Sequence, residues 1–125
     1  MTSHEISFDI ETDSDGNYTE TKNIGIPFGY LDEIKLDIPV GDPIPTTASI
    51  TITDPLPGKK LLELSVIPDA DTNTFYRVRP SVQAITGDDI TDTGERYMIK
   101  SPSLTVKITG GGNGKNAKIR IWVTR

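Results

Sequence analysis

The single histidine of the chain, His4, is the first residue to test for chemistry. A Ser or Cys nucleophile needs a neighbouring general base, and a zinc site needs several His or Cys ligands. With one His and no Cys, the chain provides neither a catalytic triad nor a thiolate zinc site. Its 18 acidic residues are scattered along the sequence and single out no carboxylate pair of the kind that cleaves glycosidic bonds. We therefore expect no enzymatic activity.

The acidic segment 13–20 is similar to the start of a calcium-binding loop. Such a loop needs its glycine at the sixth position and a bidentate Glu at the twelfth, whereas Gly16 and Glu20 stand at the fourth and eighth positions of this segment. The spacing favours a solvated hairpin turn. The acidic stretches at residues 69–73 and 88–92 are interpreted in the same way, and no metal is expected.

The glycine-rich segment 110–116 invites comparison with a phosphate-binding loop. A Walker A motif needs a glycine five residues before its Gly-Lys step and a Ser or Thr after it, but Thr109 and Asn116 occupy those positions. The segment also lies between two predicted strands, so it has no helix N-terminus to hold an anion. It is predicted to be a flexible hairpin loop that tolerates insertions, and no nucleotide or other cofactor is expected.

Composition places the chain in the all-β class. Its 125 residues suit one domain, and Ile and Thr, at 16 each, greatly outnumber Ala, at 4. The absence of Cys is compatible with assembly in a reducing cytosol. There is no apolar run of about 18 residues and no signal-peptide pattern, so no membrane association is expected.

Alternation of apolar and polar residues predicts the elements that carry these side chains. It is strict around Ile50 and Ile52, and it recurs at about ten-residue spacing with turn residues between the segments. This pattern is typical of an antiparallel β-sandwich of about eight or nine short strands. Residues 24–125 are expected to form the sandwich domain. Residues 1–23 form an acidic arm, whose strand pairs either with its own domain or with a neighbour.

The charges are unevenly distributed. Residues 1–58 carry a net charge of −9, and residues 59–125 carry +4. If the strand near residues 5–11 pairs with the strand near residues 118–124, the outward-facing Glu5, Asp9 and Glu11 come close to Lys118 and Arg120. Phe8 and Ile10 then face the apolar side. Such charges set register and partner choice more than stability.

Trp122 is predicted to face outward beside Lys118 and Arg120, because Ile119, Ile121 and Val123 form the inward set. Either a neighbouring segment covers this Trp or it anchors a protein interface, where Trp, Tyr and Arg contribute most binding energy. The candidate interface residues are Phe8, Ile10, Tyr76, Arg77, Arg79, Lys118, Arg120 and Trp122. Nucleic acid is not an expected partner, because the net charge is −5 and the basic residues form no dense stripe.

From residue 30 to residue 125, the chain resembles the small β-sandwich virion proteins of tailed bacteriophages. The resemblance lies in the alternating segments 50–54, 62–64 and 97–99, the Tyr76-Arg77 step, and the glycine-rich loop before the final strand. It implies a structural protein of the particle, assembled in the host cytoplasm and present in many copies. The most common role is capsid decoration on the major capsid protein, and otherwise a minor head-tail or tail component. The alternative, which belongs to a different class of function, is a carbohydrate-binding module for host attachment.

Overall fold

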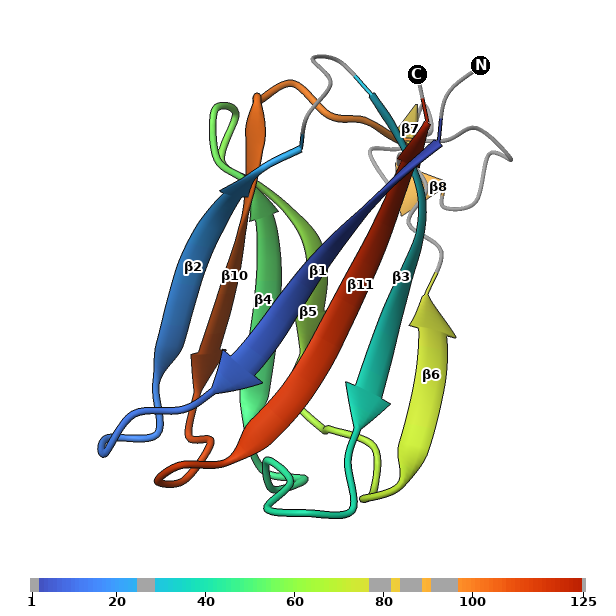
Figure 1. Ribbon diagram of the computed structural model, residues 1–125. Helices are drawn as coiled ribbons and strands as arrows, with labels where there is room; N and C mark the ends of the chain where they lie inside the picture. Colours follow the sequence, from blue (N-terminus) through green and yellow to red (C-terminus); the bar gives the residue numbers. More distant parts are fainter. Residues whose placement is uncertain (1–2, 25–28, 77–81, 84–88, 91–96, 125) are drawn as a thin grey trace.

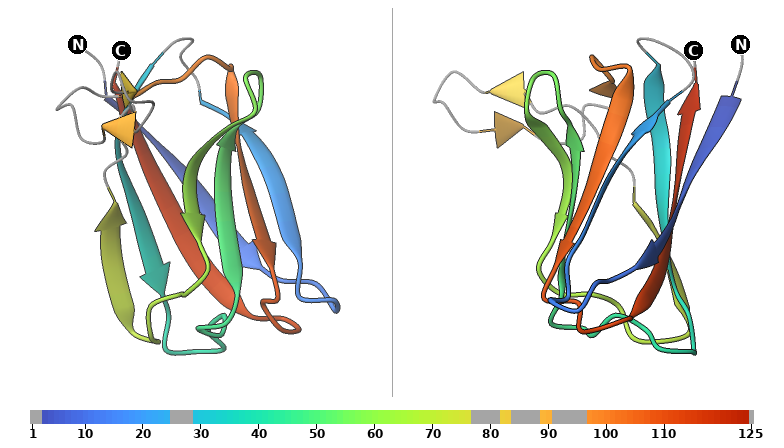
Figure 2. Two further views of the ribbon diagram at one scale, coloured as in Figure 1. Left: turned by 180° about the vertical axis from the view of Figure 1, so that it is seen from behind. Right: turned by 60° about the vertical axis from the view of Figure 1, so that its left-hand side comes forward.

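The computed structural model describes residues 3–24, 29–76, 82–83, 89–90 and 97–124. Within these residues all regular structure is β-strand, and two antiparallel sheets pack face to face, as the views in Figures 1 and 2 show. The predicted antiparallel β-sandwich is therefore confirmed. The nine strands of the two sheets in the described part of the chain agree with the eight or nine expected.

Each sheet mixes strands from both ends of the chain. Sheet A has the order β1-β11-β3-β6, with β9 also paired to β3, and sheet B has the order β2-β10-β4-β5. The strands of sheet A are β1 (Ser3–Glu11), β3 (Tyr30–Ile38), β6 (Thr72–Tyr76), β9 (Tyr97–Met98) and β11 (Asn116–Thr124). The strands of sheet B are β2 (Tyr18–Asn23), β4 (Ser49–Asp54), β5 (Lys59–Leu64) and β10 (Ser103–Thr109). A further short pair consists of β7 (Val82–Gln83) and β8 (Asp89–Ile90).

The core lies between the sheets and follows the predicted alternation. In β11, Ile119, Ile121 and Val123 are buried, while the side chains between them lie on the outer face of sheet A. The same alternation buries Leu104, Val106 and Ile108 in β10. Successive side chains of a strand point to opposite faces, so one apolar set per strand suffices to build the core.

The N-terminal segment pairs within its own chain. Strand β1 lies antiparallel to β11, from Ser3 opposite Thr124 to Glu11 opposite Asn116, and β2 pairs with β10. Of the two pairings that the sequence left open for the arm, the structure shows the one within its own domain. Acidic residues near the start and basic residues near the end of the chain thereby become neighbours on one sheet.

Two connections differ from the prediction. The Asp13–Gly16 turn and the glycine-rich segment 110–115 were both expected to close hairpins, and both expectations were wrong. The first links β1 of sheet A to β2 of sheet B, and the second links β10 of sheet B to β11 of sheet A. Figure 1 shows both at the same end of the sandwich. A short loop between alternating strands closes a hairpin or crosses between sheets equally well, so the local sequence does not decide.

These two crossings are hydrogen-bonded to each other. Thr12 donates its hydroxyl to the Gly112 carbonyl oxygen and accepts from the Lys115 amide at 2.9 Å. The Gly111 amide donates to the Gly16 carbonyl oxygen at 2.9 Å. A Cβ on Gly16, where φ is 79°, would lie 2.8 Å from the Gly112 nitrogen. The glycine-rich loop is therefore a packed structural contact, which argues against its interpretation as a passive connector.

Strand β5 keeps its alternation and gains one extra buried residue. Leu62 and Leu64 stand opposite Ile52 and Ile50 and pack against the core, whereas Val66, beyond the strand, is exposed. Leu61 is buried as well, at an irregularity in the pairing of β4 with β5 between Ile52 and Thr53. A bulge of this kind changes which side chains face inward, and an alternating sequence does not reveal it.

Candidate functional site

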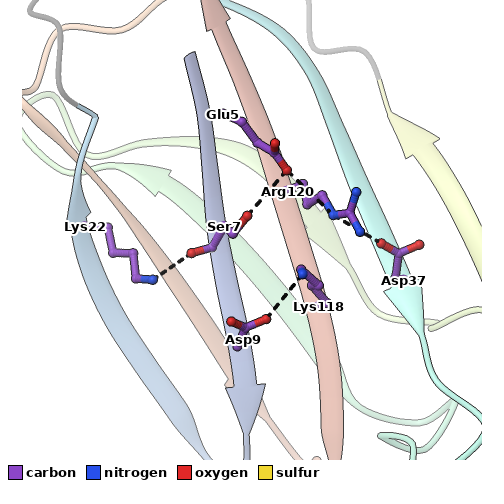
Figure 3. A network of polar contacts seen from close by, with 7 residues as sticks. All are labelled: Glu5, Ser7, Asp9, Lys22, Asp37, Lys118 and Arg120. Atoms are coloured by element: carbon purple, nitrogen blue, oxygen red, sulfur yellow. Dashed lines mark hydrogen bonds and ion pairs between the residues drawn. The ribbon is translucent and has the colours of Figure 1, made fainter.

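The outer face of sheet A carries a ladder of charged side chains. The register places Asp9 of β1 opposite Lys118 of β11, and their Oδ1 and Nζ atoms are 3.7 Å apart. Arg120 lies between two acids, because its Nε is 3.7 Å from Glu5 Oε1 on one side and 3.8 Å from Asp37 Oδ2 of β3 on the other. Figure 3 shows this arrangement across three strands. The predicted approach of the β1 acids to Lys118 and Arg120 is confirmed for Glu5 and Asp9.

These ion pairs differ in their exposure. The Asp9 side chain is 81% exposed, so water and salt screen its attraction to Lys118, and the pair is worth about 0 to 1 kcal/mol. Arg120 and Asp37 are less exposed, and Arg120 Nε and Asp37 Oδ2 are buried atoms that make no hydrogen bond. Their mutual attraction is their compensation for lost hydration. The ladder therefore fixes the register of β1 against β11 and holds Arg120 in place beside Trp122.

An aromatic pair lies next to this ladder. Trp122 of β11 and Phe75 of β6 have ring centroids 6.4 Å apart and planes inclined by 25°. The pair spans the intervening strand β3, whose Lys35 Nζ lies 5.5 Å from the Phe75 ring centroid. Phe75 remains 54% exposed. The outward orientation predicted for Trp122 is confirmed, and its contact is with an aromatic side chain that is itself open to solvent.

We call the set Phe75, Lys118, Arg120 and Trp122 the Trp122 surface. A shallow groove of about 320 Å³ adjoins it at the end of β3 and the start of β6. The residues lining this groove are Asp37, Ile38, Pro39, Asp71, Thr72, Asn73, Lys118 and Arg120. An aromatic pair with adjacent cationic and polar groups can bind another surface by apolar contact and by directed hydrogen bonds.

Three of the eight candidate interface residues have a different role or position from the one expected. Phe8 and Ile10 are 0% and 3% exposed and belong to the core, so in the folded chain they are not available to a partner. Tyr76 packs toward the core from β6, and its neighbour Phe75 faces outward in its place. Because Phe75 and Tyr76 are adjacent and both aromatic, apolar–polar alternation does not indicate which of the two faces the core. Arg77 and Arg79 lie outside the described residues.

The open side of the sandwich between β1 and β2 is covered by Lys22. Its Nζ donates to the Ser7 carbonyl oxygen at 2.6 Å, lies 5.3 Å from the Phe8 ring centroid and pairs with Glu20 at 3.4 Å. One side chain thus shields the core and occupies a carbonyl at the edge strand of sheet A (Figure 3). An edge strand protected in this way is less able to pair with a foreign strand.

The sequence pattern gave no sign of a buried carboxylate at Asp54, because this residue ends an ordinary alternating strand, β4. It accepts hydrogen bonds from the Tyr97 hydroxyl at 2.9 Å, the Lys100 amide at 2.7 Å, and both the amide and hydroxyl of Ser101. Burial raises the pKa of Tyr97 above its ordinary value of 10.0, and the hydrogen bond to Asp54 raises it further. Both carboxylate oxygens are satisfied, so this cluster ties the segment after β9 to the end of β4.

In segment 13–20, which is similar to the start of a calcium loop, the Asp13 carboxylate closes the turn of the segment itself. Asp13 Oδ1 accepts from the amides of Asp15 and Asn17, each at 2.9 Å, which closes the turn. In the described part of the chain, no group of three or more His, Cys, Asp or Glu side chains is arranged to hold a metal ion. No helix that could cross a membrane is found among the same residues.

Comparison of the chain with protein-family models and with curated proteins gives no match.

Proposed function

We propose that the chain is a non-enzymatic structural protein of a tailed-bacteriophage particle and decorates the capsid by binding the major capsid protein through the Trp122 surface. The observation that carries this proposal is the stacked pair of the exposed Phe75 and the half-buried Trp122, beside Lys118 and Arg120 on the outer face of sheet A. Buried Trp and Arg side chains contribute most of the binding energy in protein interfaces. The resemblance of residues 30–125 to phage virion proteins supports the particle as the location.

The mechanism is adhesion. The sandwich bridges neighbouring capsomers and adds contact area that resists internal pressure. A contact of about 800 Å² per partner is enough for specific attachment. Many copies on one particle compensate for modest affinity at each site. A minor head-tail or tail component uses the same kind of contact on a different partner.

A carbohydrate-binding role for host attachment is the second candidate, because one observation favours it. The Phe75 and Trp122 planes are within 25° of parallel, and the adjoining groove offers Asp37, Asn73 and Arg120 as polar groups. Aromatic rings with nearby hydrogen-bonding groups suit a sugar ring. Binding to a glycan array, lost on replacement of either aromatic, would support this role, and an array without hits would remove it.

The decisive experiment is co-sedimentation with capsids that lack the protein. Replacement of both aromatics, Phe75→Ala with Trp122→Ala, is expected to weaken binding by at least about 30-fold, the effect of a hot-spot loss. Leu56→Ala is the matched control, because Leu56 is an exposed apolar residue in the turn between β4 and β5. Circular dichroism checks that the double variant folds. Wild-type protein that fails to bind capsids or tails would refute the virion role, and a folded double variant that binds normally would refute the assigned surface.

A further inference from the structure

The outer face of sheet B differs in chemistry from that of sheet A. It is covered by small hydroxyl side chains, and a groove of about 510 Å³ runs over β4 and β10. The hydroxyl residues on this face are Thr19, Thr21, Ser49, Thr51, Thr53, Thr105 and Thr109. The register places them side by side across the strands, and the hydroxyls of Thr21 and Thr105 are 2.7 Å apart. We call this the hydroxyl face.

One cation stands in the middle of the hydroxyl face. Lys107 of β10 lies between Thr19 of β2 and Thr51 of β4, so neither cross-strand neighbour is acidic. Lys60 and Glu63, 3.1 Å apart on the edge strand β5, neutralise each other. Within residues 3–24, 29–76 and 97–124, no carboxylate pairs with Lys107. The hydroxyl face therefore presents an uncompensated positive charge among hydrogen-bonding groups.

The same chain carries a surface of opposite charge. On β1, at the edge of sheet A, Glu5, Asp9 and Glu11 are exposed, and Asp13 and Asp15 follow in the turn. Glu11 stands opposite Asn116, so the charge ladder offers it no cation. We call Glu5, Asp9 and Glu11 the acidic edge. The edge has three carboxylates against the two cations of β11, and Arg120 is shared with Asp37.

We infer that the hydroxyl face of one copy binds the acidic edge of a second copy. Charge complementarity selects this occupant, because among the described residues of one copy no acid pairs with Lys107 and no cation pairs with Glu11. A net charge of −5 disfavours long polyanions, which would be repelled by the molecule as a whole. The acidic edge of another copy, by contrast, brings only three carboxylates to the hydroxyl face. Serine and threonine hydroxyls can donate hydrogen bonds to these carboxylates.

The contact joins two different surfaces, so it is heterologous and generates a ring or an open chain of copies. Lys22 already occupies the Ser7 carbonyl on β1, so the contact uses side chains and does not extend the sheet. Phe75 lies on the opposite edge of sheet A from β1. The inference is separate from the proposed function, because self-association leaves the Phe75 side of the Trp122 surface open. Exposed ion pairs are weak and screened by salt, so association is concentration-dependent and is favoured where copies are crowded.

Sedimentation velocity over a range of concentrations tests this inference at low and at high salt. The wild-type protein is expected to associate as its concentration rises and to dissociate on addition of about 0.5 M salt. Lys107→Glu is expected to raise the dissociation constant at least tenfold. Lys100→Glu is the matched control, because it makes the same change in net charge at an exposed lysine between β9 and β10.

A mixing experiment identifies the second surface. Glu11→Lys alone is expected to lose self-association, as does Lys107→Glu alone, whereas an equimolar mixture of the two variants associates because each supplies the charge that the other lost. Asp69→Lys, in an exposed loop, is the control for Glu11→Lys. A wild-type protein that stays monomeric at low salt overturns the inference. So does a Glu11→Lys variant that still associates, or a Lys100→Glu variant weakened as much as Lys107→Glu. Capsid binding is measured separately with the aromatic variants, so the two proposals fail independently.

Discussion

Thr12 joins the two loops that cross between the sheets, and its hydroxyl makes a testable contribution to stability. Thr12 is 3% exposed, and its Oγ1 donates to the Gly112 carbonyl oxygen while accepting from the Lys115 amide. Thr12→Val keeps the shape of the side chain but removes both hydrogen bonds and leaves a carbonyl and an amide without this partner. A hydrogen bond contributes about 1 kcal/mol, and a buried unsatisfied group costs about 1 to 3 kcal/mol. We expect the free energy of unfolding to fall by about 2 to 3 kcal/mol.

Urea denaturation followed by circular dichroism measures this change, and thermal unfolding gives a second readout. In a chain of this length, 2 kcal/mol corresponds to a decrease in Tm of about 6 to 10 °C. Thr12→Ser retains the hydroxyl and is expected to lose no more than about 1 kcal/mol. Thr47→Val, at an exposed position, is expected to stay within about 0.5 kcal/mol of wild type. If Thr12→Val is as stable as Thr47→Val, the reasoning that the crossings are locked together is wrong.

Two further perturbations follow from the same structure. Gly16→Ala should destabilise the fold more than Gly41→Ala. Gly16 has φ 79° and its added Cβ would meet the Gly112 nitrogen, whereas a Cβ on Gly41 meets nothing within 4 Å. Equal unfolding midpoints for the two variants would contradict this. Burial raises the pKa of Tyr18, Tyr76 and Tyr97 above 10.0, so the folded chain retains phenol protons that the unfolded chain releases. At about pH 8 tyrosine ionisation should therefore not affect the free energy of unfolding, which should fall as the pH rises past about 10. Chemical denaturation at several pH values, combined with phenolate absorbance, measures this. A free energy of unfolding that stays constant past about pH 10 would contradict the expectation.

Local sequence determined the faces of most strands, because alternation fixes which side chains lie on which side of a pleated strand. It predicted the inward set of β11 and the outward position of Trp122, and the distribution of charge predicted the contact of Asp9 with Lys118. Each of these depends on period-two patterning or on attraction between opposite charges. The alternation is present in the residues themselves and needs no knowledge of the strand order, whereas the charge contact forms only because β1 pairs with β11.

The tertiary structure decided which strands share a sheet and what covers each exposed residue. The loop at residues 110–115 is short enough for a hairpin, yet it crosses between sheets because β10 pairs with β2 and β4 while β11 pairs with β1 and β3. The bulge between β4 and β5 moved Leu61 inward, and the phase of β6 turned Phe75 outward beside Trp122. These outcomes depend on contacts between segments far apart in the chain, and their free energies are set only when both sheets have packed.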